Sequence, residues 1–272
     1  MPSYELATVL TVATWLVIFL FGAALGSFAT VLEARIPEGQ SIVSPGSRCP
    51  NCGRGLSWSE NIPIIGWLLL RGKCKGCGKA ISRKYPLTEL TTAVLFTAAF
   101  TPGPLPHFEA ANFATAAMAV VSVPLVLIDI RLHRLPNALT YGAAICLFAI
   151  NLFSALLNGD FSQFVPVILA GLVPAIALFT VALVSRGGMG LGDVKLAVVL
   201  GWAAGLASIT AVFATFVIAF ALGGVYAIAV LVAKKADRKA AIPFGPFLLA
   251  GFWIAFLGGN FIQNVVLSPW GF

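Results

Sequence analysis

Four cysteines have the spacing of a metal site. They form two pairs, Cys49-Pro-Asn-Cys52 and Cys74-Lys-Gly-Cys77, separated by 21 residues. Each pair can fold into a tight turn that points two thiolates at one tetrahedral ion, and zinc is the ion that four thiolates favour. Because four protein ligands leave no open coordination position, such a zinc would be structural. A pair of disulfides and thiol redox chemistry are the alternatives.

Two aspartates at the ends of apolar stretches could form a catalytic pair. Asp129 ends one stretch, and Asp193 opens another after Gly190 and Gly192, with Lys195 in the same loop. Two apposed carboxyls that share one proton provide an acid and a base, which together can direct water at a peptide bond. The glycines would let an extended substrate approach closely. The alternatives are a salt bridge from Asp129 to a nearby arginine and a helix N-cap at Asp193.

Composition indicates which elements must position these residues. Of 272 residues, 59% are apolar and 10% are charged, whereas soluble chains carry roughly 25% charged residues. This excludes an ordinary soluble enzyme, a disordered chain and a disulfide-rich secreted module. We therefore expect an all-α polytopic membrane protein with about eight transmembrane helices and a small zinc-binding cytoplasmic domain. The apolar runs are 7–32, 87–100, 112–130, 138–157, 164–184, 196–207, 209–232 and 245–267.

The distribution of basic residues predicts the orientation. The chain has 17 Lys and Arg and a net charge of +7. With eight spans, all 17 lie in the alternate loops 33–86, 131–137, 185–195 and 233–244. The positive-inside rule places these loops, with the cysteines and both aspartates, on the cytoplasmic side and both termini outside. Basic residues flank the apolar runs, which indicates contact with membrane lipid and no binding of nucleic acid.

These boundaries suggest three parts. Residues 1–32 are expected to form the first transmembrane helix, and residues 33–86 the cytoplasmic zinc-binding domain. Residues 87–272 are expected to form a seven-helix membrane peptidase domain. A domain as small as the middle one would need a metal to stabilise it.

Several motifs together resemble one bacterial family. Gly190-Leu-Gly192-Asp193 is similar to the GxGD signature of intramembrane aspartic proteases. With the CxxC pairs and eight apolar runs, the chain resembles the type IV prepilin peptidases, or leader peptidase/N-methyltransferases. The other similar motifs are Gly26-Ser-Phe28, Arg35-Ile-Pro37, Asn61-Ile-Pro63, Trp67, Tyr85-Pro-Leu-x-Glu89, Leu135-Pro-Asn137-x-x-Thr140 and Ile242-Pro-Phe-Gly-Pro246.

The resemblance implies a function. It implies a multi-pass enzyme of the bacterial inner membrane that cleaves prepilins or type II secretion pseudopilins at the cytoplasmic face, with Asp129 and Asp193 as the catalytic pair. It also implies methylation of the new N-terminal amine by S-adenosylmethionine, for which residues 33–86 are the expected domain. The family usually has Leu-Asn where this chain has Ala29-Thr30. The competing hypotheses are a peptidase that does not methylate, and a transporter or channel with a zinc module.

Two glutamates near the membrane have two possible interpretations. Glu33 and Glu89 flank the polar loop on either side. Each could pair with a neighbouring Lys or Arg, or help to hold the methyl donor or the new amine of the substrate.

Overall fold

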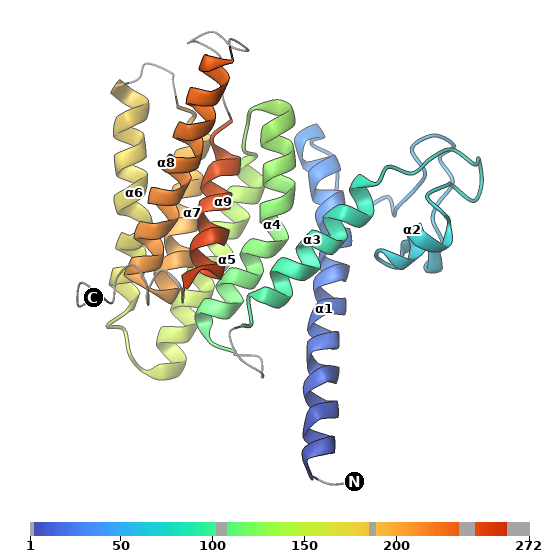
Figure 1. The fold of residues 1–272 in the computed structure, drawn as a ribbon, viewed down its shortest axis with the longest axis horizontal. Helices are drawn as coiled ribbons and strands as arrows, with labels where there is room; N and C mark the ends of the chain where they lie inside the picture. Colours follow the sequence, from blue (N-terminus) through green and yellow to red (C-terminus); the bar gives the residue numbers. More distant parts are fainter. Residues whose placement is uncertain (1–2, 102–107, 185–188, 234–242, 260–272) are drawn as a thin grey trace. The chain divides into compact units, whose positions relative to one another are not determined.

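Helices make up most of the part of the chain that the structure describes. The computed structural model describes residues 3–101, 108–184, 189–233 and 243–259, and among them no strand is found beyond two isolated bridges. The expected all-α class is confirmed. The helices are α1 (Ser3–Arg35), α2 (Ile65–Leu69), α3 (Lys84–Ala98), α4 (Ala110–Leu132), α5 (Asn137–Asn158), α6 (Phe164–Val184), α7 (Leu191–Ala207), α8 (Ile209–Val232) and α9 (Gly245–Leu257) (Figure 1).

Each of the eight expected apolar runs contains a helix. Five helices, α1, α4, α5, α6 and α8, are long and apolar enough to cross a bilayer. The helices α3, α7 and α9 have 15, 17 and 13 residues. The end of the last run, Arg186 and the four basic residues between 234 and 239 lie outside the described residues.

A capped turn separates α7 from α8. The helix α7 ends at Ala207, and Ser208 adopts an extended backbone conformation. The Ser208 hydroxyl accepts a 3.0 Å hydrogen bond from the N–H of Ala211, which makes Ser208 the N-cap of α8. This satisfies one of the free N–H groups at the start of that helix. The expected break between the sixth and seventh apolar runs is confirmed.

The described residues divide into two compact units. The first comprises residues up to Phe108 together with Ala116–Pro124, and the second comprises Glu109–Thr115 and the chain from Leu125 onward. The first unit contains α1, α3, the middle of α4 and the segment between α1 and α3. This segment, residues 36–83, includes α2, and we call it the cysteine module. The second unit contains α5 to α9, the start of α4 and its last turns.

In the first unit, α1 and α3 are in backbone contact at two glycines. A Cβ added at Gly26 would lie 2.7 Å from the Cα of Glu89, and one added at Gly22 would lie 2.9 Å from the Cβ of Phe96. Gly22 and Gly26 are four residues apart, so they lie on one face of α1. This is the small-xxx-small arrangement by which membrane helices approach closely.

In the second unit, α7 is the central helix. It packs against α5, α6, α8 and α9. A Cβ added at Gly201 would lie 2.2 Å from the carbonyl oxygen of Ala170 on α6, so these two backbones touch. Trp202 donates a 3.1 Å hydrogen bond from its indole N–H to the carbonyl of Ile168. Leu196 and Leu200 are completely buried in this core.

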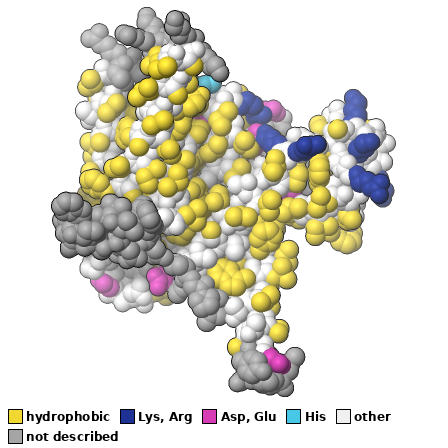
Figure 2. Space-filling view, viewed as in Figure 1, with side chains coloured by type: hydrophobic (Ala, Val, Ile, Leu, Met, Phe, Trp, Pro, Cys, Tyr) yellow, Lys and Arg dark blue, Asp and Glu magenta, His cyan; other side chains and the backbone are white. Residues whose placement is uncertain are grey.

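The outer helices of this unit present apolar side chains outward. Val173 and Ile176 on α6 are more than 60% exposed, as are Phe213 and Val225 on α8. Figure 2 shows hydrophobic side chains spread over this face of α6 and α8. A helix that is apolar on all its faces and exposed on one of them is typical of a helix that contacts lipid, because exposure of those side chains to water would be unfavourable.

Candidate functional site

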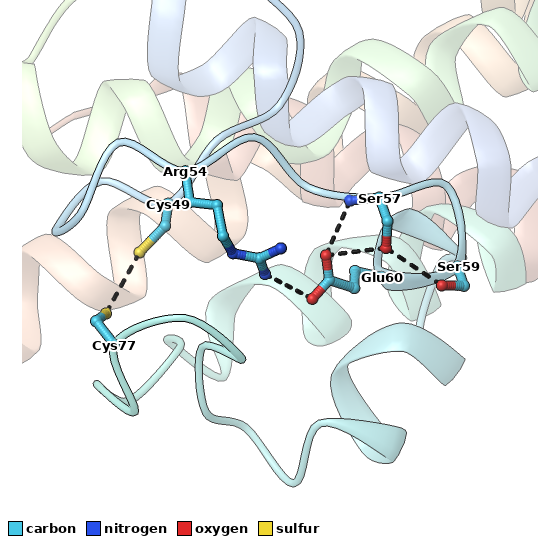
Figure 3. Close-up of polar contacts among 6 residues, drawn as sticks. All are labelled: Cys49, Arg54, Ser57, Ser59, Glu60 and Cys77. Carbon is cyan, nitrogen blue, oxygen red and sulfur yellow. Dashed lines mark hydrogen bonds and ion pairs between the residues drawn. The ribbon is translucent and has the colours of Figure 1, made fainter.

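The four cysteines of the two pairs come together in the cysteine module. Their sulfur atoms all lie within 4.8 Å of one another, and the Sγ atoms of Cys49 and Cys77 are 3.9 Å apart (Figure 3). Tetrahedral zinc with Zn–S bonds of about 2.3 Å requires S···S distances of about 3.8 Å. The cluster therefore has the ligand type, number and spacing of a structural zinc site.

Each pair sits on the same kind of turn. The N–H of Gly53 donates to the carbonyl of Cys49 (2.9 Å), and the N–H of Gly78 donates to that of Cys74 (2.8 Å). Both glycines have φ of +70°, a conformation that costs glycine little. The turn points backbone N–H groups at the first sulfur of its pair. Those of Cys77 and Gly76 lower the pKa of Cys74 to about 6.

An ion pair braces the first turn. Arg54 donates a 2.6 Å hydrogen bond to Glu60, whose other oxygen accepts from the backbone N–H (2.8 Å) and the hydroxyl (2.9 Å) of Ser57 (Figure 3). The bond from Arg54, and then that from the Ser57 N–H, lower the pKa of Glu60 to about 2. The Nε and Cδ atoms of Arg54 also lie against Gly76 of the second turn, which links the two turns.

A cavity of about 790 Å³ adjoins the cysteine turns within the first unit. Its wall combines one face of α1 with the cysteine module and the start of α3. The residues that carry polar or aromatic groups into its lining include Ser27, Thr30, Arg48, Asn61, Trp67, Tyr85 and Glu89. A volume of this order suits a ligand of cofactor size.

Glu89 is the buried carboxylate of that wall. It is 8% exposed and accepts a 2.6 Å hydrogen bond from the backbone N–H of Ile64 and a second from the side chain of Ser27. Ile64 has a φ of 62°, which is rare for a β-branched residue and is held here by that bond. Of the two interpretations open for Glu89, a ligand contact fits its place in the cavity wall.

Glu33 pairs with a lysine. Its carboxylate, buried on α1, accepts a 2.5 Å hydrogen bond from the ammonium group of Lys84 at the start of α3. Glu33 does not line the cavity. Its geometry therefore matches the structural interpretation of an ion pair beside the membrane.

In the second unit, Asp129 and Asp193 lie at neighbouring helix ends. Both are buried, with 4% and 8% exposure, and they are close enough for their charges to repel. Asp129 lies in the last turn of α4, and its Oδ2 accepts a 3.1 Å hydrogen bond from the N–H of Gly245 at the start of α9. Asp193 lies in the first turn of α7. The end of α4 and the beginnings of α7 and α9 thus come together at this pair of carboxyls.

The N-cap interpretation of Asp193 is not borne out. Gly190 is the N-cap of α7, and Asp193 is the third helical residue, with its N–H bonded to the Gly190 carbonyl at 3.1 Å. A Cβ added at Gly190 would lie 3.5 Å from Asp193 Oδ2, so this carboxyl folds back over the glycine. The carboxyl instead accepts a hydrogen bond from the backbone N–H of Gly190, as the residue at the third helical position of a capping box does.

Lys195 lies on α7 and points to α5. Its ammonium group donates a 2.9 Å hydrogen bond to the side-chain oxygen of Asn137 and lies 5.3 Å from the centre of the Tyr141 ring. The expectation that Lys195 and Gly192 lie in a loop is wrong, because both belong to α7, the helix that carries Asp193, and only Gly190 precedes it. Its contacts tie the beginnings of α5 and α7 together.

Leu135 is a part of the site that sequence reasoning gave no role. A Cβ added at Gly192 would lie 3.2 Å from the Cβ of Leu135, and one added at Gly245 would lie 3.3 Å from its Cδ2. Leu135 therefore packs between the two glycines that accompany the aspartates. Its neighbour Pro136 is the N-cap of α5. The only sequence signal was the Leu-Pro-Asn motif.

Comparison with known proteins identifies two family models in the chain. Residues 20–102 match the bacterial peptidase A24 N-terminal domain, and residues 116–228 match the type IV leader peptidase family. Prepilin leader peptidase/N-methyltransferase from Bacillus subtilis (strain 168) is 32% identical over 93% of this chain and 97% of its own length. The protein of that name from Aeromonas hydrophila is 31% identical over 92% and 93%, respectively. The protein of that name from Xanthomonas campestris is 35% identical over 82% of this chain and 76% of its own length. No solved structure matches significantly.

Proposed function

The chain belongs to the type IV leader peptidase family, and on that premise we propose that it cleaves prepilins or pseudopilins and then methylates the new N-terminus. The observation that carries the proposal is the pair of buried carboxyls, Asp129 and Asp193, at converging helix ends. The relatives are named as both leader peptidases and N-methyltransferases. The resemblance found in the sequence leads to the same activities.

The cleavage step uses the two carboxyls as one acid and one base. The ionised carboxyl takes a proton from a water molecule, whose oxygen bonds to the carbonyl carbon of the leader peptide bond. The protonated carboxyl gives its proton to the departing amine as the C–N bond breaks. Gly245 would hold Asp129 in place through its N–H. The absence of a side chain at Gly190 would leave room beside the Asp193 carboxyl for an extended substrate, whereas Leu135 fills the space at Gly192.

We propose that the site faces the cytoplasm of a bacterial inner membrane. All 17 basic residues lie in the sequence segments 33–86, 131–137, 185–195 and 233–244, which the positive-inside rule assigns to the cytoplasmic side. The helix α4 ends and α7 begins within two of these segments, and α9 begins directly after the last one. In this proposal α3, α7 and α9 cross the bilayer as well, which gives eight spans and leaves both termini outside. The exposed apolar faces of α6 and α8 contact lipid.

The cysteine module would hold a structural zinc ion. The four ligands would be Cys49, Cys52, Cys74 and Cys77, since their sulfur positions fit tetrahedral coordination. The ion would fix the two turns relative to each other and so stabilise a segment too small to fold on hydrophobic burial alone.

The cavity beside the cysteines is the proposed place of methyl transfer. S-adenosylmethionine supplies a sulfonium-bound methyl group when it is bound. Trp67 and Tyr85 offer aromatic faces in the lining, and Glu89 offers a buried carboxylate, which is a combination that favours a cationic ligand. Glu89 also suits the role of holding the substrate amine. Glu33 would serve the ion pair with Lys84 instead.

The test is cleavage of a precursor with a short basic leader by the purified chain in lipid. We expect the wild type to release the leader, and the Asp129→Asn and Asp193→Asn variants to lose this activity while keeping wild-type melting temperatures. Variants that cleave as fast as the wild type would refute the aspartic mechanism and favour the hypothesis of a transporter or channel.

Methylation is tested on the cleaved product. With S-adenosylmethionine present, we expect the mass of the product N-terminal peptide to increase by one methyl group. Cleavage without this increase would show a peptidase that does not methylate, which is the other alternative raised by Ala29-Thr30.

A further inference from the structure

The cysteine module contains one strongly apolar segment. Residues 62–70 read Ile-Pro-Ile-Ile-Gly-Trp-Leu-Leu-Leu and include the single turn of helix α2. Three of these side chains are exposed: Ile65 by 48%, Leu68 by 59% and Leu69 by 74%. Figure 2 shows hydrophobic side chains gathered at α2, with Lys and Arg side chains on the neighbouring loops. A contiguous exposed apolar patch rimmed by polar residues is typical of a surface that contacts a membrane or another molecule.

The other side of α2 is anchored in the module. Trp67 donates a 3.1 Å hydrogen bond from its indole N–H to the carbonyl of Ile81, and its ring lies against Gly72. Gly66 is buried, and an added Cβ would lie 2.4 Å from the carbonyl oxygen of Glu60. One face of α2, with Gly66 and Trp67, is therefore packed against the module. This packing fixes the position of Leu68 and Leu69, which are exposed on the opposite face.

The depth of α2 along α1 indicates what the partner is. The N–H of Ile64 bonds to Glu89, and the backbone of Glu89 contacts Gly26 of α1. Gly26 lies nine residues before Arg35, the last residue of α1, which corresponds to about 13.5 Å along the helix axis. The polar headgroup layer on one side of a bilayer is only about 5–8 Å deep. With Arg35 at the membrane surface, Gly26 lies roughly 5–9 Å below the hydrocarbon boundary, so α2 begins in the outer part of the hydrocarbon layer.

Basic residues follow the segment directly. Arg71, Lys73 and Lys75 are all exposed, and Arg71 has a φ of 50°, which turns the chain sharply after α2. Apolar side chains in the outer hydrocarbon layer, followed by cations that can reach the phosphates, match the layering of an anionic lipid surface. Binding of a soluble protein would not explain why the apolar segment lies at the depth of the acyl chains.

We propose that residues 62–70 insert into the cytoplasmic leaflet as an interfacial anchor for the cysteine module, with Ile65, Leu68 and Leu69 among the acyl chains and Arg71 and Lys73 at lipid phosphates. The anchor fixes the module and its cavity at the membrane surface. This inference rests on α1 spanning the membrane and does not depend on either catalytic activity.

A photocross-linking experiment on the full chain tests the anchor. The cross-linking amino acid p-benzoylphenylalanine is placed at position 69 or, as the matched control, at position 43, in nanodiscs of phosphatidylethanolamine and phosphatidylglycerol. Val43 is even more exposed, at 85%, but its loop is bound at the level of Arg35, which donates to the carbonyls of Ser41 and Pro45. We expect several-fold more lipid adduct at position 69 than at position 43, measured by mass spectrometry.

Two outcomes would overturn the proposal. One is equal lipid adduct at the two positions. The other is an adduct at position 69 that forms with an added precursor protein and not with lipid, which would identify the leucines as a substrate contact. Hydroxyl-radical labelling of the unaltered chain in the same nanodiscs gives an independent reading that needs no variant. There we expect Leu68 and Leu69 to be labelled several-fold less than Val43, and equal labelling would count against the anchor.

Discussion

The backbone N–H of Gly245 donates a 3.1 Å hydrogen bond to the Oδ2 of Asp129, joining residues 116 positions apart in the chain. Because the donor is the first residue of α9, the bond also directs the positive end of that helix toward the carboxylate. The orientation of Asp129 therefore depends on the position of α9. The site can be disturbed from α9 without changing either aspartate.

We expect Gly245→Ala to reduce precursor cleavage by at least about tenfold, since a methyl group at position 245 would lie 2.6 Å from Asp129 Oδ2 and push the carboxylate aside. Cleavage rates in proteoliposomes measure the effect. The control is Gly142→Ala on α5, where nothing lies within 4 Å of an added Cβ. Equal rates for the two variants would show that the contact with Gly245 does not position the carboxylate.

Changing any one of the four clustered cysteines to serine should remove most of the bound zinc. The structural reason is that the four sulfur atoms form one cluster in which each would supply a quarter of the coordination. Zinc per chain, measured by elemental analysis of the purified protein, should fall from about one to well below one half. Cys146→Ser on α5 is the control and should keep the full amount, because that residue is not part of the cluster.

Glu60→Gln should destabilise the cysteine module in a pH-dependent way. The pKa of Glu60 is about 2 in the folded chain against an ordinary value of 4.5, so the ionised form is the one that folding favours. The stabilisation is therefore complete above about pH 4.5 and is lost as the pH falls toward 2. We expect the melting temperature of Glu60→Gln to be lower than that of the wild type at pH 7 and the difference to shrink between pH 4.5 and 3. A difference that stays constant over this range would contradict the role of the ion pair with Arg54.

Glu89→Gln should abolish methylation and leave cleavage within about threefold of the wild type. The carboxylate lies in the cavity wall of the first unit, whereas both aspartates belong to the second unit. Product masses with S-adenosylmethionine present give both activities in one experiment. Glu33→Gln is the matched control, since Glu33 is also buried but lies outside the cavity lining. An equal loss of methylation in both variants would argue against a donor site in the cavity.

Features that depend on local composition could be predicted from the sequence. Hydropathy identified the apolar runs, because a helix that faces lipid must be apolar over many consecutive residues. Hydropathy also identified the boundary at Ser208, the N-cap residue that separates the apolar run of α7 from that of α8. The cysteine cluster could be predicted as well, because each CxxC turn already brings two sulfur atoms together, and the site then requires only contact between the two turns.

Features that depend on packing between distant residues could not be predicted. Nothing local to Gly245 indicates that its N–H binds Asp129, and nothing local to Leu135 indicates that it separates two glycines. The helix α2 was missed for another reason. It has five residues inside a polar loop, far fewer than the roughly 20 that identify a span. Its environment became evident only from the bond between Ile64 and Glu89.

The contact between α1 and α3 gives the last prediction. Gly26→Leu should lower the melting temperature by several degrees and weaken both activities, because a Cβ at position 26 would already lie 2.7 Å from the Cα of Glu89, and a backbone atom cannot move aside as a side chain can. Ala24→Leu is the matched control, since it adds a similar volume to an exposed position on the same helix. Thermal unfolding in detergent, followed through intrinsic tryptophan fluorescence, should separate the two variants. If both melt like the wild type, α1 and α3 do not rely on this close approach, and the height of α2 along α1 must be set by other contacts.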